Sequence, residues 1–105
     1  MYQNILNNEF KRLSKDPNAV IIDVRTPQEI QEGYIKGASV FIDFNNEDFA
    51  EKAKSLDKNK TYLLYCRSGA RSGKACKIMA DMGFSGPLYN LAKGITEWDG
   101  ETAKK

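Results

Sequence analysis

The chain of 105 residues contains no histidine and only two cysteines. Without histidine it cannot form a Cys-His dyad, so an activated thiol would depend on backbone dipoles and arginines. Two cysteines at this spacing cannot build a zinc site, and we expect neither a metal nor an organic cofactor. No stretch approaches the roughly 20 apolar residues of a membrane span. The N-terminal segment also lacks the basic region and long apolar run of a signal peptide.

Excess charge is also missing. Sixteen basic residues face 14 acidic ones, for a net charge of +2. We therefore expect neither nucleic acid nor an acidic membrane surface as a partner. With 41% hydrophobic residues, a chain of this length can bury a core without disulfides, and residues 1–105 are expected to form one domain. Free thiols without a signal peptide predict a reducing, cytoplasmic location.

Strand-like and helix-like patterns alternate along the sequence. Apolar runs predict strands at 20–24, 40–42, 61–65 and 88–91. Apolar spacing and capping signals predict helices at 6–13, 26–33, 49–56, 73–82 and 95–98. Residues 101–105 are expected to be a frayed tail. Strands separated by helices predict an α/β fold with a central parallel sheet and helices on both faces.

The most informative segment begins where the strand at 61–65 ends. Cys66 follows directly, and a loop of small residues with two arginines leads into the next helix. A thiol at the end of a strand, facing a helix N-terminus, lies where backbone N–H groups and the helix dipole favour an anion. That setting lowers the pKa of a thiol and makes it a nucleophile. The carboxyl edge of a parallel sheet is also where ligands bind.

The residues after the cysteine each suit an anionic substrate. Backbone N–H groups of this loop are expected to surround the sulfur. Gly69 allows the positive φ that a tight loop needs. Arg67 and Arg71 are candidates for holding a dianionic sulfur donor, although Arg71 is equally suited to binding loop carbonyls. Ser68 and Ser72 add hydroxyls, and Ser72 is alternatively a helix cap.

Four blocks of sequence, in this order and spacing, resemble the rhodanese (sulfurtransferase) domain of the single-domain type. The blocks are residues 22–29 (IDVRTPQE), 33–38 (GYIKGA), 65–72 (YCRSGARS) and 93–98 (KGITEW). The resemblance covers nearly the whole chain and implies the three-layer rhodanese-like fold. It also implies that Cys66 is the catalytic residue and carries a persulfide. The substrate-binding residues would be Arg67, Ser68, Gly69, Ala70, Arg71 and Ser72.

The resemblance further implies the partners of the reaction. The donor would be thiosulfate or a related sulfane compound, and the acceptor a thiol, cyanide or a protein. Three positions depart from the family pattern, and none lies in the cysteine loop. Tyr34 stands where the family usually has histidine, Phe41-Ile42 replaces Asn/His-Ile-Pro, and Lys93 replaces one of two adjacent glycines.

Other interpretations of Cys66 stay open at the level of sequence. It is an inert thiol if it only fills the core. The domain is a non-catalytic sulfur carrier or protein-interaction module if the loop binds without turnover. Cysteine-based phosphatases and arsenate reductases share the fold, but their loop is one residue longer. The four residues between Cys66 and Arg71 match the sulfur-transfer length.

Residues outside the loop also have alternative roles. Cys76 either resolves a Cys66 persulfide into a disulfide or packs a helix against the sheet. Tyr34 either lines the cleft beside the loop or covers the edge of the core. Asp23 and Arg25 are expected to be structural, with Arg25 pairing with Glu29.

Overall fold

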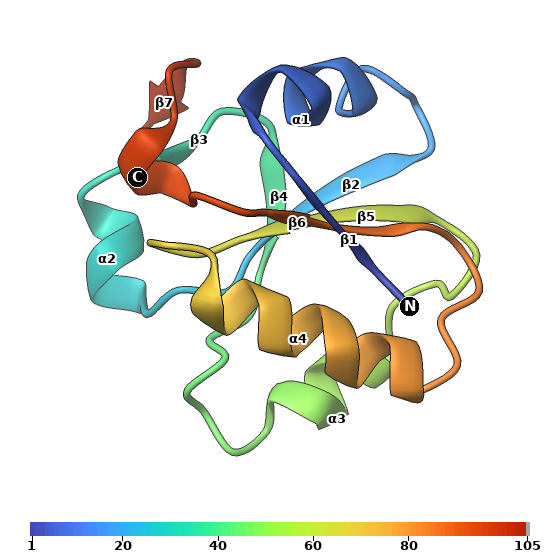
Figure 1. Ribbon diagram of the computed structural model, residues 1–105. Coiled ribbons are helices and arrows are strands. Elements are labelled where there is room, and N and C mark those ends of the chain that lie inside the picture. The colour runs from blue at the N-terminus through green and yellow to red at the C-terminus, as the bar shows by residue number, and fades with distance from the viewer. Residues whose placement is uncertain (105) are drawn as a thin grey trace.

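The computed structural model describes residues 1–104 and contains a central, fully parallel sheet. Within these residues, five strands follow the spatial order β1-β6-β5-β2-β4 (Figure 1). Their bounds are β1 Gln3–Ile5, β2 Ala19–Asp23, β4 Ala38–Phe41, β5 Thr61–Tyr65 and β6 Leu88–Leu91. The long apolar runs become the central strands β2 and β5, which are covered on both faces as parallel strands require. The predicted α/β fold with a central parallel sheet is confirmed.

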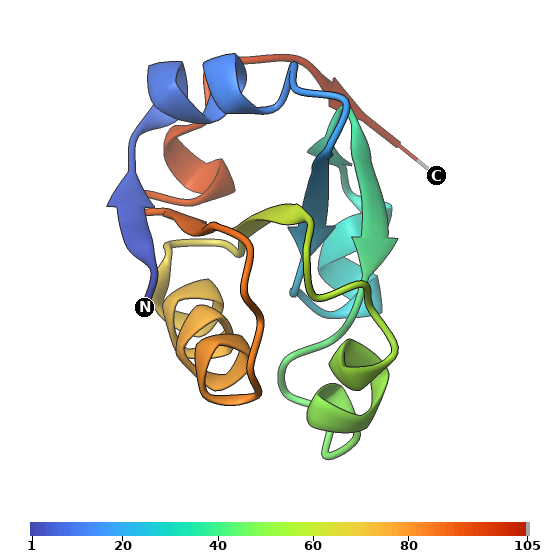
Figure 2. The ribbon, with the colours of Figure 1, turned by 90° about the vertical axis from the view of Figure 1, so that its right-hand side faces the viewer.

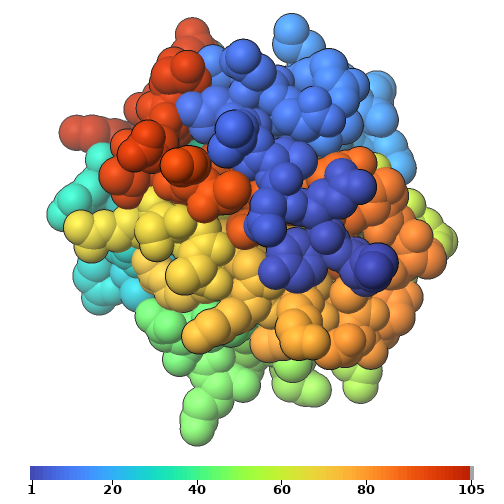
Figure 3. All heavy atoms as spheres, in the orientation of Figure 1, coloured from blue at the N-terminus to red at the C-terminus, as the bar shows by residue number. Residues whose placement is uncertain are grey.

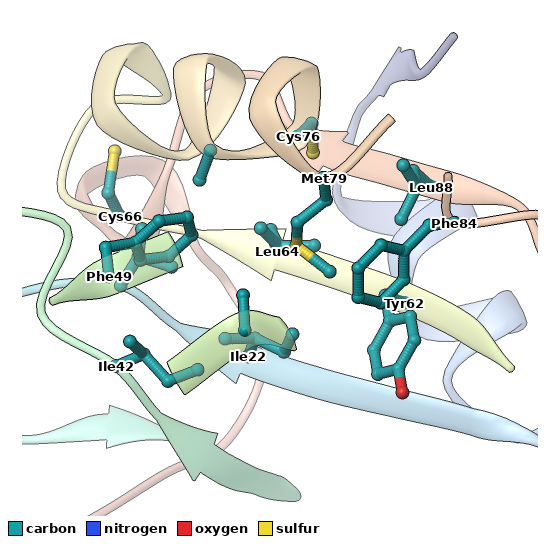
Figure 4. Packing of buried hydrophobic residues seen from close by; sticks show 13 residues of the cluster. Ile22, Ile42, Phe49, Tyr62, Leu64, Cys66, Cys76, Met79, Phe84 and Leu88 are labelled. Atoms are coloured by element: carbon teal, nitrogen blue, oxygen red, sulfur yellow. The ribbon is translucent and has the colours of Figure 1, made fainter. Parts of the chain in front are cut away.

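Helices cover both faces of the sheet (Figure 2). Their bounds are α1 Asn7–Leu13, α2 Pro27–Gln31, α3 Phe49–Lys54, α4 Ala70–Asp81 and the 3₁₀-helix η1 Ile95–Glu97. One face carries α3 and α4, and Figure 4 shows Cys76 and Met79 of α4 against Leu64 of β5. The other face packs on Phe10 of α1 and on Trp98. No helix within residues 1–104 has the length and hydropathy of a membrane span.

The sequence patterns miss three short strands. One is β1, the sheet edge that lies on the surface seen in Figure 3. The others are β3 (Tyr34–Ile35) and β7 (Thr102–Ala103), which form a separate antiparallel pair. The prediction of a frayed tail is therefore wrong for 102–103, since β7 pairs with β3; Lys105 lies outside the described residues. Strands this short carry no period of their own and depend on their pairing partners.

Two predicted helix boundaries also change. The helix after the cysteine loop begins at Ala70, three residues before the predicted start, because Gly69 adopts a φ of +96° and turns the chain directly into the helix. The segment expected as a helix at 95–98 is a single 3₁₀ turn, and Trp98 has left the helical conformation.

A buried polar network fixes the carboxyl ends of β2 and β5. The Asp23 carboxylate accepts hydrogen bonds from the Tyr65 hydroxyl and from Nε and Nη2 of Arg25. The Tyr65 oxygen in turn accepts the N–H of Ile35 at 2.9 Å, and Arg25 donates to the carbonyl of Gly33 at 2.7 Å. Arg25 also contacts Glu29 as expected, but only through the backbone carbonyl of Glu29, 3.5 Å from Nη1, while its ion pair is with Asp23. Burial, and then Asp23, raise the pKa of Tyr65. The network ties β3 to the sheet beside the cysteine loop.

We predict that Tyr65→Phe destabilises the protein by about 2 kcal/mol, because a buried carboxylate loses one donor and the Ile35 N–H loses its acceptor. Urea unfolding measures this change. Tyr62→Phe is the matched control. It removes a hydroxyl that donates to the carbonyl of Asp57, and about 1 kcal/mol is expected. Equal losses in the two variants would contradict a special role for the buried network.

Candidate functional site

Cys66 follows the end of β5 and is fully buried, with 0% of its surface exposed. The chain turns from it into α4 within residues 67–69. Gly69 is required at this turn for two reasons. Its φ of +96° disfavours other residues, and a β-carbon there would collide with the carbonyl oxygen of Ala92. The loop is thus pressed against the segment that follows β6.

Hydrogen-bond donors converge on the sulfur of Cys66. The N–H of Gly69 lies 3.1 Å from Sγ, the N–H of Ser72 lies 3.4 Å away, and the Ser72 hydroxyl lies 3.3 Å away. Burial alone raises the pKa of this thiol, but donors from Ser72, Ser68 and Gly69 outweigh it, so the pKa is lowered. Of the N–H groups expected around the sulfur, those of Gly69 and Ser72 therefore lie within hydrogen-bond distance. Ser72 does not cap α4, because Gly69 occupies the N-cap position.

The outer side of the loop is held by the segment after β6. The N–H of Ile95 donates to the carbonyl of Cys66 at 3.0 Å. The carbonyl of Arg67 accepts the N–H of Thr96 at 3.2 Å and its hydroxyl at 2.8 Å. Gly94 permits this approach, since a β-carbon there would collide with the Arg67 carbonyl. Reasoning from sequence missed Thr96, although Gly94 within the fourth family block was a usable signal.

Arg71 is bound by a carboxylate at the rim of the loop. Its Nη1 and Nη2 lie 2.8 and 3.0 Å from the two carboxylate oxygens of Glu29. Glu29 also completes the predicted capping box with Thr26 at the start of α2. The bond from Arg71 is the main cause that lowers the pKa of Glu29 to about 2. The partner of Arg71 is therefore the Glu29 carboxylate and not a loop carbonyl. The sequence did not predict this tertiary contact.

Arg67 has a different environment from Arg71. It is exposed, and it forms no ion pair within the part of the chain that the structure describes. It lines a cavity of about 500 Å³ beside the loop, together with Glu29, Glu32 and Thr96. An exposed guanidinium beside such a cavity is available to an anionic ligand.

The remaining candidates have structural positions. Cys76 is fully buried, donates to the carbonyl of Tyr89 at 3.6 Å, and has its pKa raised to about 12 by burial. Figure 4 shows it well along α4 from Cys66, packed toward the sheet. The ring of Tyr34 packs edge-on against Phe41 at a centroid distance of 5.2 Å. Among residues 1–104, no three His, Cys, Asp or Glu side chains gather as metal ligands.

The ion pair between Glu29 and Arg71 predicts a pH-dependent stability. The folded state depresses the pKa of Glu29, so its contribution is present above the ordinary carboxyl pKa and is lost as the pH falls toward about 2. Glu29→Gln keeps an oxygen for the capping box but removes the charge. We expect it to lose about 1 kcal/mol near pH 7, given its partial exposure, and clearly less near pH 2, where much of the Glu29 carboxylate is protonated.

Urea unfolding at the two pH values tests this prediction. The control is Glu9→Gln, which breaks an exposed pair with Arg12 and is expected to change stability little at either pH. A loss of the same size at both pH values for Glu29→Gln would mean that the charge pair is not its cause.

Comparisons with known proteins agree with the geometry. The model of the family "Rhodanese-like domain" matches residues 6–101. A Bacillus subtilis protein named "Putative sulfurtransferase YtwF" is 37% identical over 90% of this chain and 87% of its own length. The thiosulfate sulfurtransferase GlpE of Pseudomonas entomophila is 31% identical over 92% of this chain and 95% of its own length. A tRNA uridine(34) hydroxylase of Cytophaga hutchinsonii is 40% identical over 86% of this chain, which spans only 29% of that protein.

Solved structures give the same result. A rhodanese-like domain protein from Staphylococcus aureus superposes with a TM-score of 0.82 at 28% identity, and 98% of each chain is covered. A structure described as a rhodanese with anions, from E. coli, has a TM-score of 0.65 at 30% identity over 83% of this chain and 99% of its own. With the family model spanning nearly all of the sequence, and with relatives named as sulfurtransferases, this chain belongs to the rhodanese-like domain family.

Proposed function

We propose that this protein is a sulfurtransferase that moves a sulfane sulfur through a persulfide on Cys66. The observation that carries the proposal is the convergence of hydrogen-bond donors on one buried sulfur. A buried charge needs such donors. They would stabilise the thiolate before transfer, and the backbone N–H groups among them would stabilise the persulfide after it. An inert core thiol needs none of them.

The first half-reaction loads the sulfur. The Cys66 thiolate attacks the outer sulfur of thiosulfate, and the new S–S bond forms as the S–S bond of thiosulfate breaks. Sulfite leaves with the electron pair of the broken bond. The negative charge of the nucleophile then resides on the outer sulfur of the persulfide, where N–H groups of the loop can receive it.

The second half-reaction removes that sulfur. Cyanide, a small thiol or a protein thiol attacks the outer sulfur, and the Cys66 thiolate is the leaving group. With cyanide the product is thiocyanate. No redox partner is needed, because the sulfane sulfur passes from one nucleophile to the next and the thiolate is regenerated.

The loop suits sulfur in size as well as in charge. Only residues 67–69 separate Cys66 from α4, which leaves room for a single transferred atom within the ring of N–H groups, including those of Ser68 and Gly69. The helix begins at Ala70, whose methyl side chain is too small to obstruct the ring of N–H groups. The names of the relatives support the same chemistry, since one is a thiosulfate sulfurtransferase, and a solved rhodanese of this fold is described with anions.

We further propose that the two arginines act differently. Within residues 1–104 Arg67 has no carboxylate partner, and it lines the cavity, so it is the group that would bind the sulfite portion of the sulfur donor. Arg71 keeps a positive charge close to Cys66, but Glu29 neutralises much of it. The arrangement attracts a dianion without holding it tightly, which lets sulfite leave.

We predict that thiosulfate adds one sulfur atom to Cys66 and that cyanide or a small thiol removes it. Intact mass spectrometry with peptide mapping measures both steps. Cys66→Ser should abolish the adduct and the transfer, whereas Cys76→Ser should keep most of both, because Cys76 is buried with a raised pKa. Turnover by the Cys66→Ser variant would refute the mechanism. A stable adduct that no acceptor removes would indicate a sulfur carrier instead of an enzyme.

We also predict that Arg67→Ala and Arg71→Ala discriminate between donors by charge. For dianionic thiosulfate, kcat/KM should fall by less in Arg71→Ala, because Glu29 largely neutralises the charge of Arg71, and about tenfold in Arg67→Ala. For the monoanionic donor methanethiosulfonate the loss should be smaller, about threefold, because one negative charge less is bound. The thiosulfate effect should also shrink as ionic strength rises.

The remote exposed arginine Arg12 provides the control, since it pairs with Glu9 on α1. Arg12→Ala should leave kcat/KM unchanged for both donors. If Arg67→Ala and Arg71→Ala reduce the use of both donors equally, the two arginines maintain the shape of the loop and do not bind the anion.

A further inference from the structure

Asn90 lies beside the cysteine loop and is 3% exposed. It is the third residue of β6, and its amide group reaches two other elements. Nδ2 lies 3.1 Å from the carbonyl oxygen of Gly69 and 2.9 Å from Oδ1 of Asn4 on β1. A backbone carbonyl can only accept a hydrogen bond, so the group that faces Gly69 must be the NH₂. The orientation of the amide is therefore determined by the fold.

This orientation directs the amide oxygen at Ser72. Oδ1 of Asn90 is within hydrogen-bond distance of the Ser72 hydroxyl. The amide oxygen carries no proton, so Ser72 must be the donor in this contact. The same hydroxyl oxygen lies 3.3 Å from Sγ of Cys66. A serine hydroxyl has one proton, so two acceptors compete for it.

The charge on Cys66 decides which acceptor forms the hydrogen bond with the Ser72 hydroxyl. When Cys66 is a neutral thiol, its S–H can donate to the Ser72 oxygen while Ser72 donates to Asn90, and every group has a partner. When Cys66 is a thiolate, it can only accept. The hydroxyl then turns to Sγ, because a hydrogen bond to an ion is the stronger one. Oδ1 of Asn90 is left buried without its donor, which is unfavourable.

We propose that Asn90 is a positioning residue that acts through Ser72. It accepts the hydrogen bond of the Ser72 hydroxyl while Sγ is uncharged, and it gives up this hydrogen bond when Cys66 ionises. By offering a competing acceptor, Asn90 makes the thiol less acidic than the other donors alone would make it. The proposal deepens the proposed function and rests on it for one consequence. In the persulfide the negative charge lies on the outer sulfur, so the Ser72 hydroxyl again donates its hydrogen bond to Asn90. The hydroxyl would therefore change its acceptor in each half-reaction.

Charged groups around Cys66 act in addition to this hydroxyl. They are Arg67 in the loop and Arg71 on α4, whose own charge is influenced by Glu29 of α2 and by Asp43 after β4. Asn90 and Ser72 are uncharged, and replacing them leaves this set intact. A change in the acidity of Cys66 in their variants is therefore a hydrogen-bond effect.

The test is the pH dependence of alkylation of Cys66 by iodoacetamide, located by peptide mapping so that Cys76 is scored separately. Ser72→Ala should decrease the ionisation constant of Cys66 about tenfold, because the thiolate loses a donor. Asn90→Leu, of similar shape, should increase it severalfold, because the competing acceptor is gone. In the Ser72→Ala background, Asn90→Leu should have no further effect, which is the signature of action through Ser72.

Other outcomes would overturn the proposal. If Asn90→Leu changes the ionisation of Cys66 equally with and without Ser72, Asn90 acts by a structural route. If Ser72→Ala leaves the ionisation unchanged, the hydroxyl does not serve the thiolate, and this result needs no variant of Asn90. Should Asn90→Leu not fold, as judged by circular dichroism, Asn90→Val takes its place, because valine suits a strand.

Asn4→Ala is the matched control. It removes one acceptor of the Asn90 NH₂ without touching Oδ1, and it should leave the acidity of Cys66 unchanged. The titration uses no sulfur donor and no acceptor. Failure of sulfur transfer and failure of this proposal are therefore separate results.

Discussion

The cysteine loop is governed by one stereochemical constraint: a loop that turns several N–H groups toward a common centre leaves backbone carbonyls pointing away from that centre. Here the centre is Sγ of Cys66, and the outward carbonyls need partners because the loop is packed against the protein. The carbonyls of Cys66 and Arg67 are bonded by the turn after β6, and the carbonyl of Gly69 by Asn90. The conformation of the loop thus depends on β6 and its turn as much as on its own sequence.

Uncharged and charged groups occupy different parts of the site. Uncharged hydrogen-bond donors contact the sulfur itself. No counter-ion is therefore buried beside it, and the desolvation cost of burying a second charge is avoided. The charged groups stay at the rim, where Arg71 is paired with Glu29 and Arg67 is exposed. Under the proposed function, a thiolate stabilised by dipoles would stay nucleophilic while the arginines at the rim would bind the anionic sulfur compound. We infer that this separation lets the site release an anionic product.

Sequence reasoning succeeded where one local pattern decides the structure. The apolar runs at 20–24 and 61–65 located the central strands, and the Thr26-Glu29 capping box located α2. It failed where a tertiary partner decides. The spacing of Arg25 and Glu29 suggested a local pair, yet Asp23 holds the arginine and Glu29 reaches 42 positions along the chain to Arg71. The short strands β3 and β7 depend on pairing with each other, and neither segment alone carries a sequence pattern that predicts this pairing.

The two cysteines show why burial alone does not distinguish the proposed nucleophile from a core thiol. Both are completely buried, yet the pKa of Cys66 is lowered and that of Cys76 is raised to about 12. The difference lies in which backbone groups face the sulfur. Cys66 meets N–H groups at the start of a helix, whereas Cys76, within the same helix, meets the carbonyl of Tyr89. Hydrogen bonds from these N–H groups favour the Cys66 thiolate, whereas at Cys76 burial acts without them and raises the pKa. The direction of the backbone dipoles around each sulfur, set by where α4 begins, therefore distinguishes the proposed nucleophile from a core residue.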